Sequence, residues 1–223
     1  MLHAPGSPNP RQNWRLPVAF VAATAVAGCA APFSDFQSAR TLEPGQFEVT
    51  PSYSYVQFRE GGESEKVQDE FGLQAAVGVG ERVELRAKYF ALRVSDDGDS
   101  ETFNALAFGP KVSLLEDQVA LYAPVGLGFG GDIETAETWQ LQPTLLVTLP
   151  ISGQVELNPS AKAQIWLNND ADNLLALNLG AGLSNDLTRW AVRPEVGVMI
   201  NPGEDGAFLH FGLGFSAAVG ERR

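Results

Sequence analysis

The chain has 223 residues and a formal net charge of −12, because 27 Asp and Glu residues outnumber 15 Lys and Arg residues. A negative field of this size argues against binding of nucleic acid or of anionic substrates. The single cysteine excludes an intramolecular disulfide and a cysteine-rich metal site.

The first part of the chain has the pattern of an export signal. Arg11 and Arg15 precede an apolar stretch, residues 16–26, which is far shorter than the roughly 20 residues of a membrane-spanning helix. We therefore expect residues 1–28 to be a signal peptide. The stretch ends in Val26-Ala27-Gly28-Cys29, which resembles the lipobox of bacterial lipoproteins. The resemblance implies cleavage before Cys29, a diacylglycerol on its sulfur and an acyl group on its amine, with no other cofactor. An ordinary signal peptide with an incidental cysteine is the alternative.

Residues 29–45 show no apolar period and include Pro32, Pro44 and Gly45. This composition predicts a lipidated tether that leads into a folded domain over residues 46–218, followed by a short tail, 219–223. Ala30 and Ala31 stand where an acidic residue would favour inner-membrane retention in enterobacterial lipoproteins. The resemblance therefore implies delivery to the outer membrane.

A strand start recurs at a fixed interval through the domain. Five similar tetrapeptides carry Phe47, Val83, Val119, Val155 and Trp190 at their second position, with spacings of 36, 36, 36 and 35 residues. Each tetrapeptide opens a run of about ten residues that alternates between apolar and polar, as β-strands do, and a second such run follows. A repeat of this length indicates one supersecondary unit used five times. We therefore predict an all-β fold: a ten-stranded antiparallel up-and-down transmembrane β-barrel built of five hairpins.

Two barrel types fit this alternation, a soluble barrel with its apolar face inside and a membrane barrel with its apolar face outside. Tilted strands of about ten residues cover roughly 25 Å, the height of the apolar band of an outer-membrane barrel. The apolar face is nearly free of charge and carries aromatic residues near the strand ends. These features favour the membrane barrel. A periplasmic, lipid-anchored, lipocalin-like barrel that binds a small apolar ligand is the alternative.

The predicted connections alternate between short and long. The short ones are 80–82, 115–118, 150–154 and 184–189, and the longer ones lie around 59–70, 93–101, 130–137, 168–172 and 201–206. Short periplasmic turns and longer outer loops are typical of membrane barrels. An even strand number would put both ends of the barrel on the periplasmic side, with the lipid of Cys29 in the inner leaflet of the outer membrane.

The longer connections hold sixteen acidic residues against three basic ones, which accounts for the net charge. Solvated, mutually repelling loops are the simplest interpretation. Clustered carboxylates also attract divalent cations, and the candidate ligands are Asp96, Asp97, Asp99, Asp170 and Asp172.

The polar face of the predicted strands carries nine charged residues that would face the lumen. They are Glu48, Glu84, Arg86, Lys88, Lys111, Glu156, Lys162, Arg193 and Glu195. Charges in a narrow lumen must be paired or hydrated. We expect an ion-pair network that fills and closes the lumen, with a selectivity ring in a pore as the alternative.

No catalytic motif is found. His210 is the only histidine after the signal peptide, Ser216 follows on the same strand face, and no Gly-x-Ser-x-Gly sequence occurs. We expect no enzymatic activity. The lipobox and the barrel pattern together resemble small bacterial outer-membrane β-barrel lipoproteins. This resemblance implies a Gram-negative outer-membrane location, contact with membrane lipid, and a structural or narrow-pore role.

Overall fold

The computed structural model describes residues 32–220 apart from 97–98, 132 and 169–170. The predicted signal peptide and Cys29 therefore lie outside the described residues. Within the described part, no helix is long and apolar enough to cross a membrane. The helix η1 (Thr135–Glu137) is a single 3-10 turn, and β-strands make up most of the rest.

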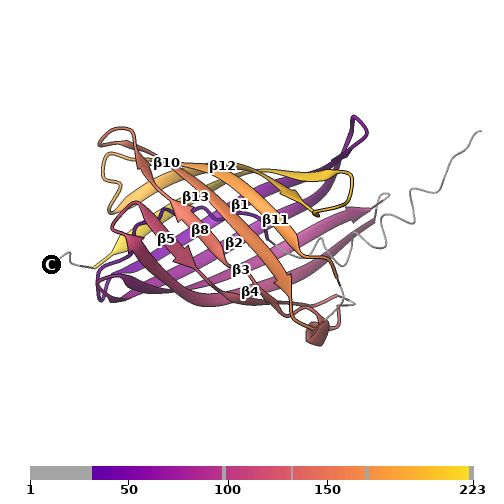
Figure 1. Cartoon of the computed structure of the whole chain (residues 1–223), viewed down its shortest axis with the longest axis horizontal. Helices are drawn as coiled ribbons and strands as arrows, with labels where there is room; N and C mark the ends of the chain where they lie inside the picture. Colours follow the sequence, from indigo (N-terminus) through magenta and orange to yellow (C-terminus); the bar gives the residue numbers. More distant parts are fainter. Residues whose placement is uncertain (1–31, 97–98, 132, 169–170, 221–223) are drawn as a thin grey trace, which may run out of the picture.

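Thirteen strands form one antiparallel sheet that closes into a barrel (Figure 1). The strands are β1 (Phe47–Glu60), β2 (Glu63–Gly80), β3 (Val83–Asp96), β4 (Asp99–Leu115), β5 (Val119–Tyr122), β6 (Val125–Phe129), β7 (Gln140–Leu141), β8 (Thr144–Val147), β9 (Leu149–Pro150), β10 (Val155–Trp166), β11 (Leu174–Leu183), β12 (Trp190–Ile200) and β13 (Ala207–Val219). β1 pairs with both β2 and β13, and β10 pairs with β11, so the sheet has no open edge at these strands. Ten strands form the closed ring. The short strands β6, β7 and β9 are additional to these ten: β6 pairs with β4 and β7, and β7 and β9 pair with β10.

Two of the three short strands, β6 and β7, lie beside a proline that interrupts the backbone ladder. Pro124 separates β5 from β6, and Pro143 separates β7 from β8. Proline has no N–H to donate, but its carbonyl still accepts. The Pro124 oxygen accepts from the Gln142 N–H at 3.0 Å, and the Pro143 oxygen accepts from the Ala163 N–H at 3.0 Å. Pro124 and Pro143 therefore interrupt the regular strands without opening the wall. Four other prolines lie within unbroken strands: Pro51, Pro110, Pro159 and Pro194.

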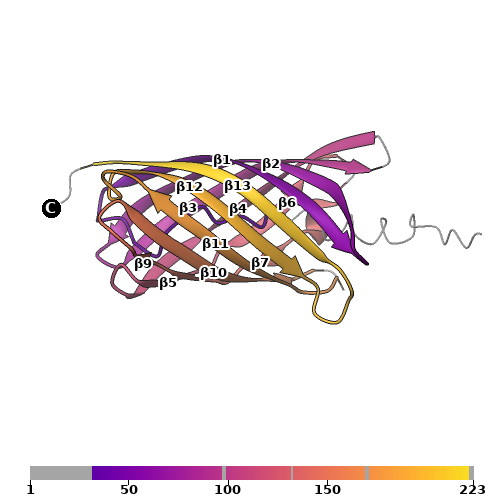
Figure 2. The ribbon, with the colours of Figure 1, turned by 90° about the horizontal axis from the view of Figure 1, so that it is seen from above.

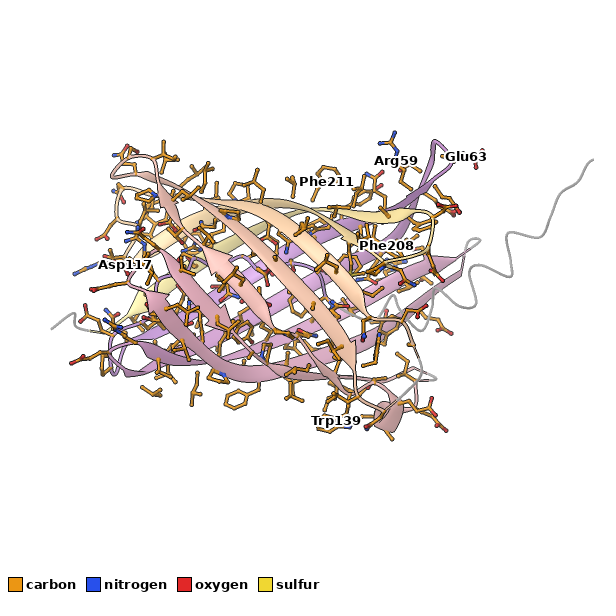
Figure 3. The ribbon with its side chains drawn as sticks, in the orientation of Figure 1. Arg59, Glu63, Asp117, Trp139, Phe208 and Phe211 are labelled. Carbon is orange, nitrogen blue, oxygen red and sulfur yellow. The ribbon has the colours of Figure 1, made fainter. Side chains whose placement is uncertain are left out.

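The barrel has two different ends. We call the end with the connections β2–β3, β4–β5, β9–β10 and β11–β12 the turn end, and the opposite end the loop end. β1 begins and β13 finishes at the turn end, which is at the left in Figures 1 and 2. Figure 3 shows Asp117 at the turn end, and Arg59 and Glu63 at the loop end.

Two of the predicted long loops are wrong, because most of their residues belong to strands. β1 and β2 stay paired out to Glu60 and Glu63, and Gly61 and Gly62 turn the chain with positive φ angles of 59° and 91°. Two successive positive φ angles make a tight hairpin turn. β3 and β4 likewise stay paired to Asp96 and Asp99. Both hairpins extend past the apolar part of the barrel, where polar residues occupy both strand faces and no alternation marks a strand.

Side-chain direction follows the alternation in the sequence. On β2, Leu73 is exposed and Gln74 is buried; on β8, Leu145 is exposed and Thr144 is buried. The same parity puts apolar side chains outside and polar side chains inside around the ring. The interior of the barrel is therefore where charged groups meet.

Candidate functional site: the charged lumen and its plug

All nine charged residues that the strand parity assigns to the lumen lie inside the barrel. Eight of them are buried, and the side chain of Glu48 is 14% exposed at the turn end. They come from β1, β3, β4, β10 and β12, so the network reaches around the wall. The structure adds a tenth charged residue, Glu70 of β2, which is also buried.

The largest departure from the sequence prediction is the segment before β1. Residues 32–45, which we call the plug, run into the lumen instead of forming a connecting tether, and only Pro44 and Gly45 at their carboxyl end are exposed. Side chains from Phe33 to Ala39 are all buried, and Figures 1 and 2 show this indigo segment within the ring. The predicted tether over residues 29–45 is therefore corrected for the part that is described.

The plug enters the lumen because the wall satisfies its backbone. A segment without a strand partner must find acceptors for its N–H groups when it is buried. Glu195 accepts the N–H groups of Asp35 and Phe36 at 2.8 and 2.9 Å. Further along the plug, Thr148 Oγ1 accepts from the Ala39 N–H at 2.8 Å.

Basic side chains of the wall satisfy the plug carbonyls in the same way. Lys162 Nζ donates to the Phe33 oxygen at 2.8 Å. Lys111 Nζ donates to the Arg40 oxygen at 2.6 Å. At the turn end of the plug, Glu84 accepts from the Leu42 N–H at 3.0 Å. The lumen charges therefore bind the plug as well as each other.

Asp35 is the centre of the network. Its carboxylate oxygen Oδ1 lies 3.2 Å from Lys88 Nζ and 3.0 Å from Lys162 Nζ. The other oxygen, Oδ2, accepts from Ser160 Oγ at 2.7 Å and from Asn178 Nδ2 at 2.9 Å. Two buried cations thus share one buried carboxylate that four wall side chains hold in place.

A second group of ion pairs lies nearer the turn end. Arg86 contacts both Glu48 and Glu84, at 2.7 and 2.9 Å. Glu84 also lies 2.9 Å from Lys111 Nζ. Since each carboxylate and cation is paired, removal of one partner would leave a buried charge uncompensated.

The plug also joins the wall on the opposite side of the turn end. Arg40 of the plug contacts Glu156 of β10 at 2.9 Å, and Arg193 of β12 contacts the same residue at 3.3 Å. Asp35 and Arg40 of the plug thus add a carboxylate and a cationic side chain to the charged groups of the wall.

Aromatic side chains of the plug fill the remaining space. Phe36 packs over Gly212 and Gly214 of β13, and a Cβ atom built on Gly214 would lie 3.0 Å from the Phe36 Cβ. Phe36 also has a positive φ of 45°, which is uncommon for a residue with a bulky side chain. Glycines on the inward face therefore leave room for the plug.

A small cavity lies beside the plug. It has a volume of about 30 Å³ and lies at the turn end, lined by residues of the plug and of the wall that include Arg40, Glu84 and Arg193. A water molecule in the liquid takes up about the same volume. Among the described residues, the plug side chains from Phe33 to Ala39 and most charged side chains of the wall are buried around each other.

Of the five predicted cation ligands, only Asp172 has a described side chain. Asp97 and Asp170 lie outside the described residues. For Asp96 and Asp99, only the backbone is described, where the two residues pair between β3 and β4. Asp172 accepts a hydrogen bond from Asn201 Nδ2 at 3.1 Å. Among the described residues, no group of three or more His, Cys, Asp or Glu side chains could hold a metal ion.

His210 and Ser216 do not form a catalytic pair. Both are buried on the inward face of β13, and six residues of extended strand separate them by roughly 20 Å. Ser216 Oγ accepts from Arg193 Nε at 2.9 Å, and His210 Nε2 lies 3.6 Å from Glu195.

Comparison with known proteins gives only distant similarities. No protein-family model matches the chain, and no curated protein sequence matches it. Among solved structures, the chain is similar to Ail, the attachment invasion locus protein of Yersinia pestis, with 14% identity, a TM-score of 0.39, and coverage of 79% of this chain and 99% of that one.

Two further structures have a similar level of likeness. The translocator domain of the autotransporter NalP from Neisseria meningitidis has 11% identity and a TM-score of 0.44, with 89% of this chain and 95% of that one covered. An outer membrane channel from Pseudomonas putida F1 has 10% identity and a TM-score of 0.47, with 83% and 100% covered.

Proposed function

We propose that the chain is an outer-membrane β-barrel lipoprotein of a Gram-negative bacterium, with a structural or narrow-pore role and no enzymatic activity. In this proposal, five hairpins make an up-and-down barrel that crosses the membrane. Cys29 carries the lipid anchor, and the plug and the lumen charges keep the barrel closed.

The observation that carries the proposal is the outer face of the barrel. Large apolar side chains are exposed on strands all around the ring, among them Leu73, Phe108, Leu145, Leu179, Phe211 and Leu213, which are 44–55% exposed. Figure 3 shows Phe211 and Trp139 on this face. Soluble monomeric proteins rarely expose a continuous apolar patch larger than a few hundred Å². A hydrocarbon solvent around the barrel accounts for such a face.

A lipocalin-like barrel with an apolar ligand site is not supported. Such a barrel needs its apolar face inside, whereas buried Asp35, Lys88, Arg86 and Glu195 occupy this lumen. The apolar side chains that do lie inside form small clusters, one of which contains Phe90, Leu92, Phe103 and Ala105.

Among the roles open to a membrane barrel, the packed lumen favours a structural one over a steady pore. Ions would have to cross a region where a plug carboxylate is already paired with two lysines. Side chains alone fill barrels of eight strands, and here an additional segment occupies the lumen of a ring with ten.

Site-directed labelling tests the membrane proposal. In a Cys29→Ser background, single cysteines in place of Leu145, Leu157 and Leu179 should react with a lipid-soluble maleimide and resist a water-soluble one. A cysteine in place of the buried Thr144 is the matched control and should resist both. Rapid reaction of all three outward positions with the water-soluble reagent would reject the membrane location.

Mass analysis of the amino-terminal peptide tests the anchor. The wild-type protein should carry a diacylglycerol and an acyl chain on Cys29, and Cys29→Ser should carry neither. An unmodified wild-type terminus at another residue would show that an ordinary signal peptide is used.

A further inference from the structure

The plug runs in one direction through the barrel. Its carboxyl end lies at the turn end, where the Gly45 N–H donates to the Gly78 carbonyl at 2.9 Å. Gly78 is two residues from the last residue of β2, Gly80. From there the plug extends back through the lumen toward its amino end at Pro32.

The amino end of the plug lies near the loop end. Phe33 belongs to a cluster with Leu174, Met199 and Phe208, and its ring centroid is 5.8 Å from that of Phe208. These three wall residues are the first of β11, the last but one of β12 and the second of β13. Phe33 therefore lies within about one residue of the loop-end limit of three strands.

The position of Pro32 along β10 allows the distances to both ends to be compared. Gln164 Nε2 donates to the Pro32 carbonyl at 3.5 Å. Gln164 is nine residues from Val155 at the turn end and two from Trp166 at the loop end. With a rise of about 3.3 Å per residue and a tilt near 40°, these spans are roughly 23 Å and roughly 5 Å along the barrel axis.

A lipidated Cys29 cannot reach the turn end from this position. It precedes Pro32 by three residues, and three residues span at most about 11 Å. That length suffices for the loop end and is about half of what the turn end requires.

We propose that the chain is threaded through its own barrel from the outer to the periplasmic side, so that its amino terminus lies at the cell surface and the acyl chains of Cys29 enter the outer leaflet. This inference rests on the proposed function, which makes the loop end the outer end. It replaces the sequence-based expectation of an anchor in the inner leaflet.

Distance measurements on the purified full-length mature protein test the threading without reference to a membrane. In a Cys29→Ser background, a spin label on Ala31→Cys is paired either with one on Glu204→Cys at the loop end or with one on Glu116→Cys at the turn end. The distance to position 116 should exceed the distance to position 204 by on the order of 25 Å, the height of the apolar band. The reverse order would overturn the threading.

Protease access in intact cells tests the surface location. A recognition site for a specific protease is inserted between Ala31 and Pro32, after Gly203 in the β12–β13 connection, or after Arg223. The first two sites should be cut in intact cells, and the third only after the outer membrane is permeabilised. Cleavage of the Ala31 site only after permeabilisation, with the Gly203 site cut in intact cells, would overturn the inference.

The Gly203 control separates this inference from the proposed function. If the Gly203 site is also protected in intact cells, the outer-membrane orientation is wrong and the surface location is overturned with it. The spin-label distances then still report whether the plug is threaded from the loop end.

Discussion

Oδ1 of Asp35 lies 3.0 Å from Nζ of Lys162 inside the barrel, and this pair joins the plug to the wall. Both side chains are buried, and Lys88 shares the same carboxylate. The plug is thus part of the charge balance of the lumen. Its removal or neutralisation should change both the stability of the barrel and its permeability to ions.

The first prediction is that Asp35→Asn destabilises the barrel by about 3–5 kcal/mol, because Lys88 and Lys162 would be left buried without a carboxylate. The free energy of unfolding in detergent micelles, followed by denaturant titration, measures the effect. Asp205→Asn in the exposed β12–β13 connection is the control and should stay within about 0.5 kcal/mol. Equal stability of Asp35→Asn and the wild type would mean that the plug does not occupy the lumen.

The second prediction concerns conductance. The wild-type protein should give little or no steady current in a planar bilayer, because the plug and the ion pairs fill the lumen. Deletion of residues 32–43 should give a steady current, since the charges that bind the plug would then be hydrated. Removal of residues 221–223, which lie after β13, is the control.

Because the deletion exposes several charged groups at once, its folding needs a separate check. A shift in gel mobility between unboiled and boiled samples identifies an intact membrane barrel. The triple variant Glu84→Ala, Arg86→Ala, Arg193→Ala keeps the plug and removes wall charges, and it should also raise the current. A large steady current from the wild type would reject the closed lumen.

The third prediction is that Gly212→Val destabilises the barrel by about 1–3 kcal/mol through overpacking. A Cβ atom at Gly212 would overlap the Phe36 ring and the Ser54 hydroxyl. Gly153→Val is the matched control, because no heavy atom lies within 4 Å of its Cβ position.

A double-mutant cycle shows whether the plug causes this cost. Phe36→Ala should recover part of the stability that Gly212→Val loses, since the smaller side chain leaves space for valine. Additive losses in the double variant would mean that Phe36 does not pack over Gly212.

The lumen charges were predictable from the sequence, whereas the plug was not. Residues such as Arg86 and Glu195 lie on strands whose period of two assigns each position to one face. The plug forms no strand, and its contacts lie far away in the sequence: Asp35 bonds Ser160 and Asn178. The alternation of apolar and polar residues along a strand cannot indicate contacts between residues so far apart in the sequence.

Two features of the sequence did point to an occupant of the lumen. The inward face is rich in glycine, including Gly212 and Gly214, so its own side chains leave space. The predicted lumen set also had one more base than acids, and the predicted tether contained Asp35 together with Phe33 and Phe36. Aromatic residues beside a carboxylate are unusual in a solvated linker.

The same reasoning explains the strands that were missed at the loop end. A period of two marks a strand only where its two faces meet different environments. Glu63, Ser64, Glu65 and Lys66 of β2 are all exposed, so their sequence looks like a loop. Backbone pairing continues there because the Gly61-Gly62 turn closes the hairpin.

The last prediction concerns the solvent around the barrel. Leu145 lies on the outer face of β8 and is 44% exposed. At a half-exposed position in water, Leu145→Arg should change the free energy of unfolding by less than about 0.5 kcal/mol. At the middle of a membrane barrel, the same substitution should cost about 2–4 kcal/mol. The measurement is refolding into lipid vesicles at increasing denaturant concentration, with Leu145→Phe as an apolar control that should remain near the wild type.

Thr144→Arg should also be destabilised, because Thr144 is buried and pairs across the ladder with Lys162, so a second cation would enter the packed lumen. Destabilisation of Thr144→Arg with an unchanged Leu145→Arg would therefore keep the packed lumen and reject the lipid-facing wall.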